Sequence, residues 1–176
     1  GDIYVGRFDN QLQRTFYQGW KSIHGLKYET LELANGITLF VSTPVSSRAS
    51  DLDILAESDI NNLFAQIQVG NRDQYTMFGD SIYPDDRSHI RTYNLVNNTY
   101  MKSIRIANEW HYGELVNLFP FMDYRCNMKM LADRKIKMYY YVCTILRNCH
   151  TCLYGNATSD YFRPVALPNL SAYISN

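Results

Sequence analysis

The sequence predicts a single α/β domain over residues 1–176, in which an antiparallel hairpin precedes several helices. Its 176 residues suit one domain, and its 46% apolar and 19% charged residues are typical of globular proteins. Two strand-like runs are joined by an Asn-Gly turn, and a helical apolar pattern follows them. No apolar run reaches the roughly 18–20 residues that a membrane helix needs, so we expect no membrane partner.

The hairpin is the first element that the sequence predicts. Residues 26–33 and 37–43 are rich in Tyr, Thr, Leu, Phe and Val, which favour strands. Asn35 and Gly36 lie between these runs, and both tolerate the positive φ angles of a tight hairpin turn. We therefore expect two antiparallel strands joined at this turn.

A helix is predicted to begin near Asp51. Ser50, followed three residues later by Asp53, has the pattern of a capping box. Gly70 is expected to end the helix. Apolar residues recur every three or four positions, which predicts one buried helical face: Leu52, Leu55, Ala56, Ile60, Leu63, Phe64 and Ile67.

The remaining elements follow from similar patterns. Residues 75–78 predict a short buried strand that ends just before Asp80, and residues 81–98 predict a long polar loop. Thr99 is expected to cap a helix that runs to about residue 118, and the tail from Asn156 is expected to be extended. A further helix is predicted over residues 130–153 with these side chains buried: Leu131, Met138, Val142, Ile145 and Leu146.

Three acidic residues lie where active sites of nucleic-acid enzymes place carboxylates. Asp51 follows the hairpin, Asp80 follows the short strand, and Glu109 lies inside a predicted helix. Mg²⁺ prefers oxygen ligands, and a pair of such ions can stabilise both the attacking and the leaving oxygen of a phosphodiester. A helix cap, a turn residue and a solvated helical glutamate are the alternatives for the three positions.

Several motifs are similar to those of DDE-type transposases of the Harbinger-like group, the DDE superfamily endonucleases. They include Gln-Arg-Thr-Phe-Tyr-Gln-Gly-Trp-Lys at 13–21, Gly-Asp-Ser-Ile-Tyr at 79–83 and Arg-Ile-Ala-Asn-Glu-Trp-His-Tyr-Gly at 105–113. Shorter matches lie at residues 24–28, 35–36, 44–48, 145–148 and 158–162. The segments occur in collinear order over nearly the whole chain, which makes the resemblance specific.

The resemblance implies an RNase H-like fold, with a mixed sheet, an antiparallel hairpin and flanking helices. It further implies that Asp51, Asp80 and Glu109 are the catalytic residues and bind Mg²⁺ or Mn²⁺ for cleavage or transfer of DNA strands. DNA would be the partner, with recognition supplied in part by a separate DNA-binding domain or protein. A nuclear location follows from this activity.

The start of the chain departs from the family pattern. The family's first catalytic aspartate lies on a strand ahead of the residue 13–21 motif, whereas only residues 1–12 precede that motif here. Asp2 and Asp9 lack the expected sequence context. We therefore expect a fragment that is truncated at its N-terminus, lacks the first strand and has reduced or no activity. A domesticated, non-catalytic domain that binds DNA or another protein is the alternative.

Three weaker patterns each have two interpretations. Between residues 125 and 147 six basic residues face one acidic residue, a local net charge of +5, which suits either a phosphate-binding surface or a solvated helix face. Cys149 and Cys152 have the spacing of a zinc half-site or a redox pair, but buried free cysteines are favoured because no second pair exists at a suitable spacing. His111 lies about 200° around the helix from Glu109 and is expected to be a packing or surface residue.

Overall fold

The computed structural model of the protein describes residues 2–4, 17–18, 23–68, 75–79, 83, 90–91, 98–123, 135–163 and 165–175. The chain divides into two compact units. The first unit comprises residues 1–49 and 107–176, and the second comprises residues 50–106. The single-domain organisation therefore stays a prediction.

The first unit contains a small antiparallel sheet built around β3 (Ile23–Lys27). Three short strands pair with β3: β1 (Asp2–Tyr4), β2 (Tyr17–Gln18) and β6 (Val45–Ser46). A strand thus precedes the hairpin at residues 2–4, where the sequence pattern had indicated none.

The predicted hairpin is confirmed as β4 (Thr30–Glu32) and β5 (Thr38–Val41), which pair antiparallel around a turn at Asn35 and Gly36. The run over residues 26–33, predicted as one strand, is divided between β3 and β4. The division falls at Tyr28, whose buried ring stacks on that of Tyr140 at 4.1 Å between centroids.

The glycine of the hairpin turn should not tolerate a side chain. Gly36 has φ +81°, and a Cβ there would overlap the side-chain amide of Asn156, which donates to the Gly36 carbonyl at 3.1 Å. We expect Gly36→Ala to lower the free energy of unfolding by about 1–2 kcal/mol in urea denaturation, because the positive φ and the overlap add.

Gly113→Ala is the matched control for this prediction. Gly113 lies inside a helix, and a Cβ at this position would meet no atom within 4 Å. Alanine there should raise the free energy of unfolding by about 0.5–1 kcal/mol through its higher helix propensity. Equal effects of the two substitutions would contradict the strain assigned to the turn.

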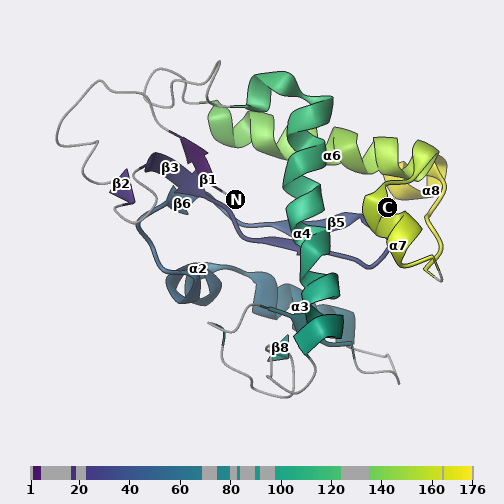
Figure 1. The fold of residues 1–176 in the computed structure, drawn as a ribbon, viewed down its shortest axis with the longest axis horizontal. Coiled ribbons are helices and arrows are strands. Elements are labelled where there is room, and N and C mark those ends of the chain that lie inside the picture. The colour runs from purple at the N-terminus through teal and green to yellow at the C-terminus, as the bar shows by residue number, and fades with distance from the viewer. Residues whose placement is uncertain are drawn as a thin grey trace. The chain divides into compact units, whose positions relative to one another are not determined.

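Helices cover the hairpin of the first unit (Figure 1). They are the C-terminal part of α4 (Asn98–Leu118) and α6 (Ile136–Tyr154), and the 3₁₀ turn η2 (Pro120–Met122) follows α4. The hydrophobic core consists of side chains from the hairpin region and these helices: Tyr28, Leu115, Met122, Ile136, Tyr140 and Cys143. The helix predicted over residues 130–153 exists, but α6 begins at Ile136, and Leu131 lies outside the described residues.

The predicted buried face of α6 is wrong. Met138, Val142, Ile145 and Leu146 are between 48% and 59% exposed. The opposite face is buried instead, and much of it is polar: Ile136, Tyr140, Cys143, Thr144, Arg147, Asn148 and Thr151. The reason is that Arg147 forms ion pairs with two glutamates from other elements of the same unit, which fixes the orientation of the helix.

The C-terminal tail is helical and not extended as predicted. It forms α7 (Ala157–Tyr161) and α8 (Leu170–Ser175). Asn156 caps α7 in a capping box with Ser159, which explains the start of this short helix. Tyr173 of α8 accepts a hydrogen bond at 3.0 Å from Asn148 of α6.

The second unit contains α2 (Asp51–Glu57), α3 (Ile60–Gln68) and the parallel pair β7 (Met77–Phe78) and β8 (Ile90–Arg91). The predicted capping box of Ser50 and Asp53 is confirmed. The one helix predicted from residue 51 is broken at residues 58–59, where the chain becomes extended at Ser58. The buried apolar residues in the described part of this unit are Ile54, Ile60, Phe64 and Met77, so only Ile60 and Phe64 of the predicted helical face are buried.

Three further expectations concern this unit. The strand predicted at residues 75–78 is shorter and only partly buried, since Phe78 is 48% exposed. β8 lies within the predicted loop, and α4 begins at Asn98, one residue before the predicted cap.

None of the described helices is both long and apolar enough to cross a membrane.

Candidate functional site

The structure describes two of the three predicted catalytic carboxylates. Asp51 is the first residue of α2 and is half-buried, whereas Glu109 is exposed on α4. Asp80 lies outside the described residues. Asp51 and Glu109 belong to different compact units. Within the described part of the chain, no three His, Cys, Asp or Glu side chains gather to form a metal site.

Asp51 is not the cap of its helix. The Ser50 hydroxyl accepts a hydrogen bond from the Asp53 amide at 3.1 Å, and the Asp53 carboxylate accepts one from the Ser50 amide. Hydrogen bonds from the Ser50 side chain and backbone lower the pKa of Asp53. The capping alternative for Asp51 is therefore wrong, because Ser50 and Asp53 perform that role.

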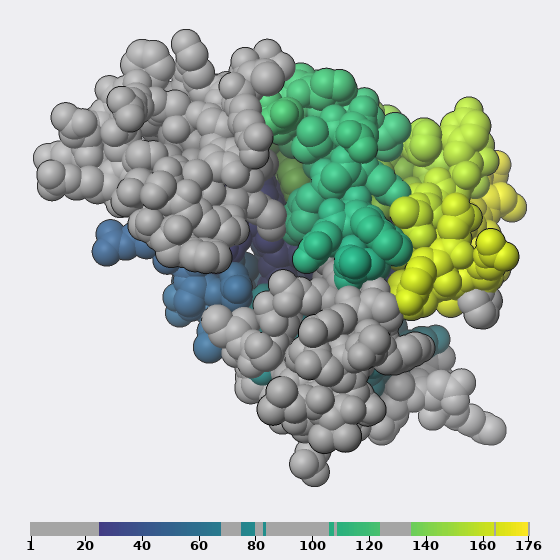
Figure 2. All heavy atoms as spheres, in the orientation of Figure 1, coloured from purple at the N-terminus to yellow at the C-terminus, as the bar shows by residue number. Residues whose placement is uncertain are grey.

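Glu109 is exposed on a helix that is fixed by its neighbours. The next residue, Trp110, is half-buried and packs edge-on against Tyr161 of α7, with 5.7 Å between ring centroids. Figure 2 shows the C-terminal part of α4, in green, side by side with the yellow C-terminal segment. Trp110 thus packs within the protein, and Glu109 presents an accessible carboxylate from the same helix.

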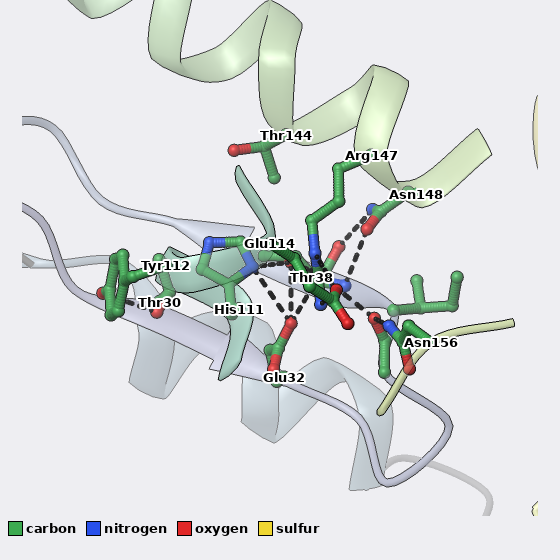
Figure 3. A network of polar contacts seen from close by, with 12 residues as sticks. Thr30, Glu32, Thr38, His111, Tyr112, Glu114, Thr144, Arg147, Asn148 and Asn156 are labelled. Carbon is green, nitrogen blue, oxygen red and sulfur yellow. Dashed lines mark hydrogen bonds and ion pairs between the residues drawn. The ribbon is translucent and has the colours of Figure 1, made fainter. Parts of the chain in front are cut away.

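A buried polar network, which sequence reasoning missed, lies in the first unit around Arg147 (Figure 3). Arg147 of α6 is fully buried and forms ion pairs with Glu32 of β4 at 2.6 Å and Glu114 of α4 at 2.8 Å. We call the following residues the Arg147 network: Glu32, Thr38, His111, Glu114, Arg147 and Asn148.

Arg147 also donates hydrogen bonds to the hairpin turn and to the start of β5. Its Nη1 donates to the Gly36 carbonyl and to the Thr38 hydroxyl, each at 3.1 Å. Glu114 extends the same connection to α7, because its Oε1 accepts from the Ala157 amide at 3.2 Å. One guanidinium group and one carboxylate thus connect the hairpin, α4, α6 and α7. The geometry uses the planar donor fork that distinguishes Arg from Lys.

His111 of α4 is the second titratable group at the centre of the network. Its Nδ1 lies 3.1 Å from Glu32 Oε1, and its Nε2 lies 3.3 Å from the Tyr140 hydroxyl. Burial lowers the pKa of His111, although Glu32 opposes this effect. Burial also raises the pKa of Tyr140. The contacts suit a neutral imidazole that donates from Nδ1 to Glu32 and accepts the Tyr140 proton at Nε2.

Asn148 completes the edge of β5. Its Oδ1 accepts from the Thr38 amide at 3.0 Å, and its Nδ2 donates to the Thr38 carbonyl at 2.8 Å. The side chain thereby replaces a neighbouring strand at this residue, which satisfies both buried backbone groups. The amide also fixes α6 against the hairpin.

The network is buried, so its role is to hold the first unit together and not to bind a nucleic acid. This corrects the interpretation of the basic stretch for Arg147, which does not face phosphate. Lys135 and Lys137 are exposed, and the other three basic residues lie outside the described part of the chain. His111 is a packing residue, as expected. The sequence did contain an indication of this network, because polar residues recur along one side of α6: Thr144, Arg147, Asn148 and Thr151.

The described cysteines are free. Cys143 is buried, whereas Cys149 and Cys152 are half-buried. Burial raises the pKa of the Cys143 thiol, and that of Cys152 is raised by burial and by Cys149. None of these three residues forms a disulfide, the expected burial holds for Cys143 alone, and Cys126 lies outside the described residues.

Comparison with known proteins gives one match. Residues 4–148 match the model of a protein family described as DDE superfamily endonuclease. The match includes all three predicted carboxylates and every member of the Arg147 network. No curated protein and no solved structure matches the chain.

Proposed function

Because the chain belongs to the family of DDE superfamily endonucleases, we propose that it is a Harbinger-like, transposase-derived domain that cleaves or transfers DNA strands with a divalent metal. The observation that supports this proposal is the family match over residues 4–148, which includes Asp51, Asp80 and Glu109. An RNase H-like fold, DNA as the partner and a nuclear location belong to the same proposal.

The proposed site consists of three carboxylates, the donor type that hard divalent cations prefer. Asp51, Asp80 and Glu109 would hold Mg²⁺ or Mn²⁺. A bound ion would activate the attacking oxygen and stabilise the charge on the leaving oxygen. The exposed position of Glu109 allows access to a large substrate such as DNA.

The Arg147 network supports this function by fixing the helix that presents Glu109. His111 and Glu114 lie two and five residues beyond Glu109 on α4, and both are bound to buried partners in the first unit. A helix held at these two residues has little freedom to rotate or slide. Its exposed carboxylate is therefore positioned before any ligand arrives.

A plasmid-nicking assay tests the proposal. The chain is incubated with supercoiled DNA and Mg²⁺ or Mn²⁺, and its rate of nicking, which we expect to be low but measurable, is compared with that of Asp80→Asn and Glu109→Gln. We expect each variant to lose about 100-fold or more of the rate, because a metal-bound carboxylate contributes several kcal/mol to the transition state.

Glu57→Gln is the matched control, because Glu57 is an exposed helical carboxylate outside the proposed site. It should nick at the wild-type rate. Equal rates for the wild type and Asp80→Asn would contradict the proposed site. DNA binding that weakens with salt, without any nicking by the wild type, would contradict the enzymatic function and favour the domesticated, non-catalytic domain.

A further inference from the structure

The outward face of α6 is apolar and lies in solvent. Met138 is 59% exposed, Ile145 54%, and Leu153 57%. We call the following six residues the α6 stripe: Met138, Val142, Ile145, Leu146, Cys149 and Leu153. They cover about 100° of the helix circumference at 3.6 residues per turn, and none of them is charged. A solvated helix face normally carries polar and charged residues.

The orientation of this face is fixed by the rest of the unit. The opposite side of α6 holds Arg147 and Asn148, whose buried contacts reach the hairpin and α4. Turning the stripe inward would expose Thr38 and would separate Arg147 from both of its glutamates. The stripe is therefore held outward by the same interactions that stabilise the first unit.

The exposed area suits a protein interface. Half-exposed side chains of this size give roughly 500 Å² of apolar surface, at the upper end of what a monomer normally exposes in one patch. Two such faces would together bury roughly 1,000 Å², which meets the lower limit for a specific interface.

The spacing of the stripe identifies a second copy of the chain as its partner. The six positions read the same from either end, since the steps between them are four, three, one, three and four residues. Two antiparallel helices related by a two-fold axis between Ile145 and Leu146 would place Met138 against Leu153 and Val142 against Cys149. We propose that this protein forms a dimer through antiparallel pairing of the two α6 stripes.

A two-fold interface needs a surface that complements itself, and the α6 stripe meets this condition. The apolar steps of three and four residues are those of helices that pack knobs into holes. A second copy would also bury the side chains that the sequence predicts to be buried: Met138, Val142, Ile145 and Leu146. The proposal does not depend on the nuclease function.

The first test is the oligomeric state of the whole chain by analytical ultracentrifugation over a range of concentrations. The wild type should dimerise, and the double variant Ile145→Glu/Leu146→Glu should weaken dimerisation by about 100-fold or more, because charges would be buried at the two-fold axis. Lys137→Glu is the control, because Lys137 is exposed on α6 outside the stripe. A wild type that stays monomeric at every concentration would overturn the proposal.

The second test is disulfide cross-linking, which reports the direction of pairing. At 1.5 Å per residue, Cys149 lies about 5 Å from the proposed axis, so the two Cys149 residues would be about 10 Å apart along the helices. Val142→Cys would instead face the native Cys149 of the second copy. Mild oxidation of this variant should give a covalent dimer on gels without reductant, and Val142→Cys/Cys149→Ser should not.

The cross-linking also separates the alternatives. Parallel pairing would place identical residues together, so the wild type would cross-link through Cys149 and the double variant through residue 142. That result would overturn the antiparallel arrangement. Within one chain residues 142 and 149 are about 10 Å apart along the helix, so an internal disulfide cannot replace the expected product. Absence of a covalent dimer from Val142→Cys, with its thermal unfolding unchanged, would also contradict the proposal.

Discussion

Replacing Arg147 with Met should lower the free energy of unfolding by about 3–5 kcal/mol. Arg147 is fully buried and is the cation that compensates Glu32, whose side chain is only 3% exposed, and Glu114, which is 23% exposed. Met has a similar length but leaves both carboxylates without their countercharge. It also removes the donors that Gly36 and Thr38 receive from the guanidinium group.

Urea denaturation of the wild type and the variant at neutral pH measures this effect. Lys137→Met is the matched control, since it makes the same kind of change at an exposed position of the same helix. It should alter the free energy of unfolding by less than about 0.5 kcal/mol. If Arg147→Met does not fold, Glu114→Gln provides a milder test with an expected loss of about 1–2 kcal/mol. A loss for Arg147→Met as small as that for Lys137→Met would contradict the role of the network.

Local chemistry in the sequence predicted part of the fold correctly. The hairpin follows from Asn35 and Gly36, because a tight turn needs residues that accept positive φ, and Gly36 has φ +81°. The start of α2 follows from the spacing of Ser50 and Asp53, whose side chains satisfy each other's backbone amides. The residues that form such a turn or capping box lie only a few positions apart. A short stretch of sequence therefore contains every residue that takes part.

The orientation of α6 could not be predicted in the same way. The helix has an apolar side and a polar side, and the usual expectation places the apolar side in the core. The structure reverses this because Glu32 and Glu114 supply the countercharges for Arg147. These partners are 115 and 33 residues away in the chain. Periodicity along one helix contains no information about such distant groups.

The sequence predicted which residues form the candidate site but not how these residues are arranged in space. Asp51 and Glu109 have the expected places at the start of a helix and inside one, yet they belong to different compact units. The family match spans both of them and Asp80. The chemistry assigned to the three carboxylates therefore depends on the resemblance, and the nicking assay with its matched control tests it.

A pH dependence of stability centred on His111 is the second large effect that we expect. Burial lowers the pKa of His111 in the folded chain below its ordinary value of 6.5. The unfolded chain therefore takes up a proton as the pH falls through about 6.5, while the folded chain does not. Stability must then decrease with falling pH, by up to about 1.4 kcal/mol per pH unit. Above pH 6.5 His111 is neutral in both the folded and the unfolded chain, so this loss of stability does not occur there.

The groups that face His111 explain why the folded chain resists its protonation. Arg147 opposes a second positive charge, and the Tyr140 hydroxyl donates its proton toward Nε2. A protonated Nε2 would donate to the Tyr140 oxygen instead, so the buried hydroxyl proton would need another acceptor. Glu32 favours the charged imidazole, but it is already paired with Arg147. Desolvation therefore decides the direction of the shift.

Urea denaturation between pH 5.5 and 8 tests this prediction with His111→Gln, which should flatten the profile. His150→Gln is the control, because His150 is exposed on α6, and its profile should match that of the wild type. A direct NMR titration of the imidazoles provides a second measurement if His111→Gln folds poorly. It should show that the His111 ring titrates below pH 6.5. A His111 resonance that titrates at or above pH 6.5 would contradict the neutral, buried imidazole.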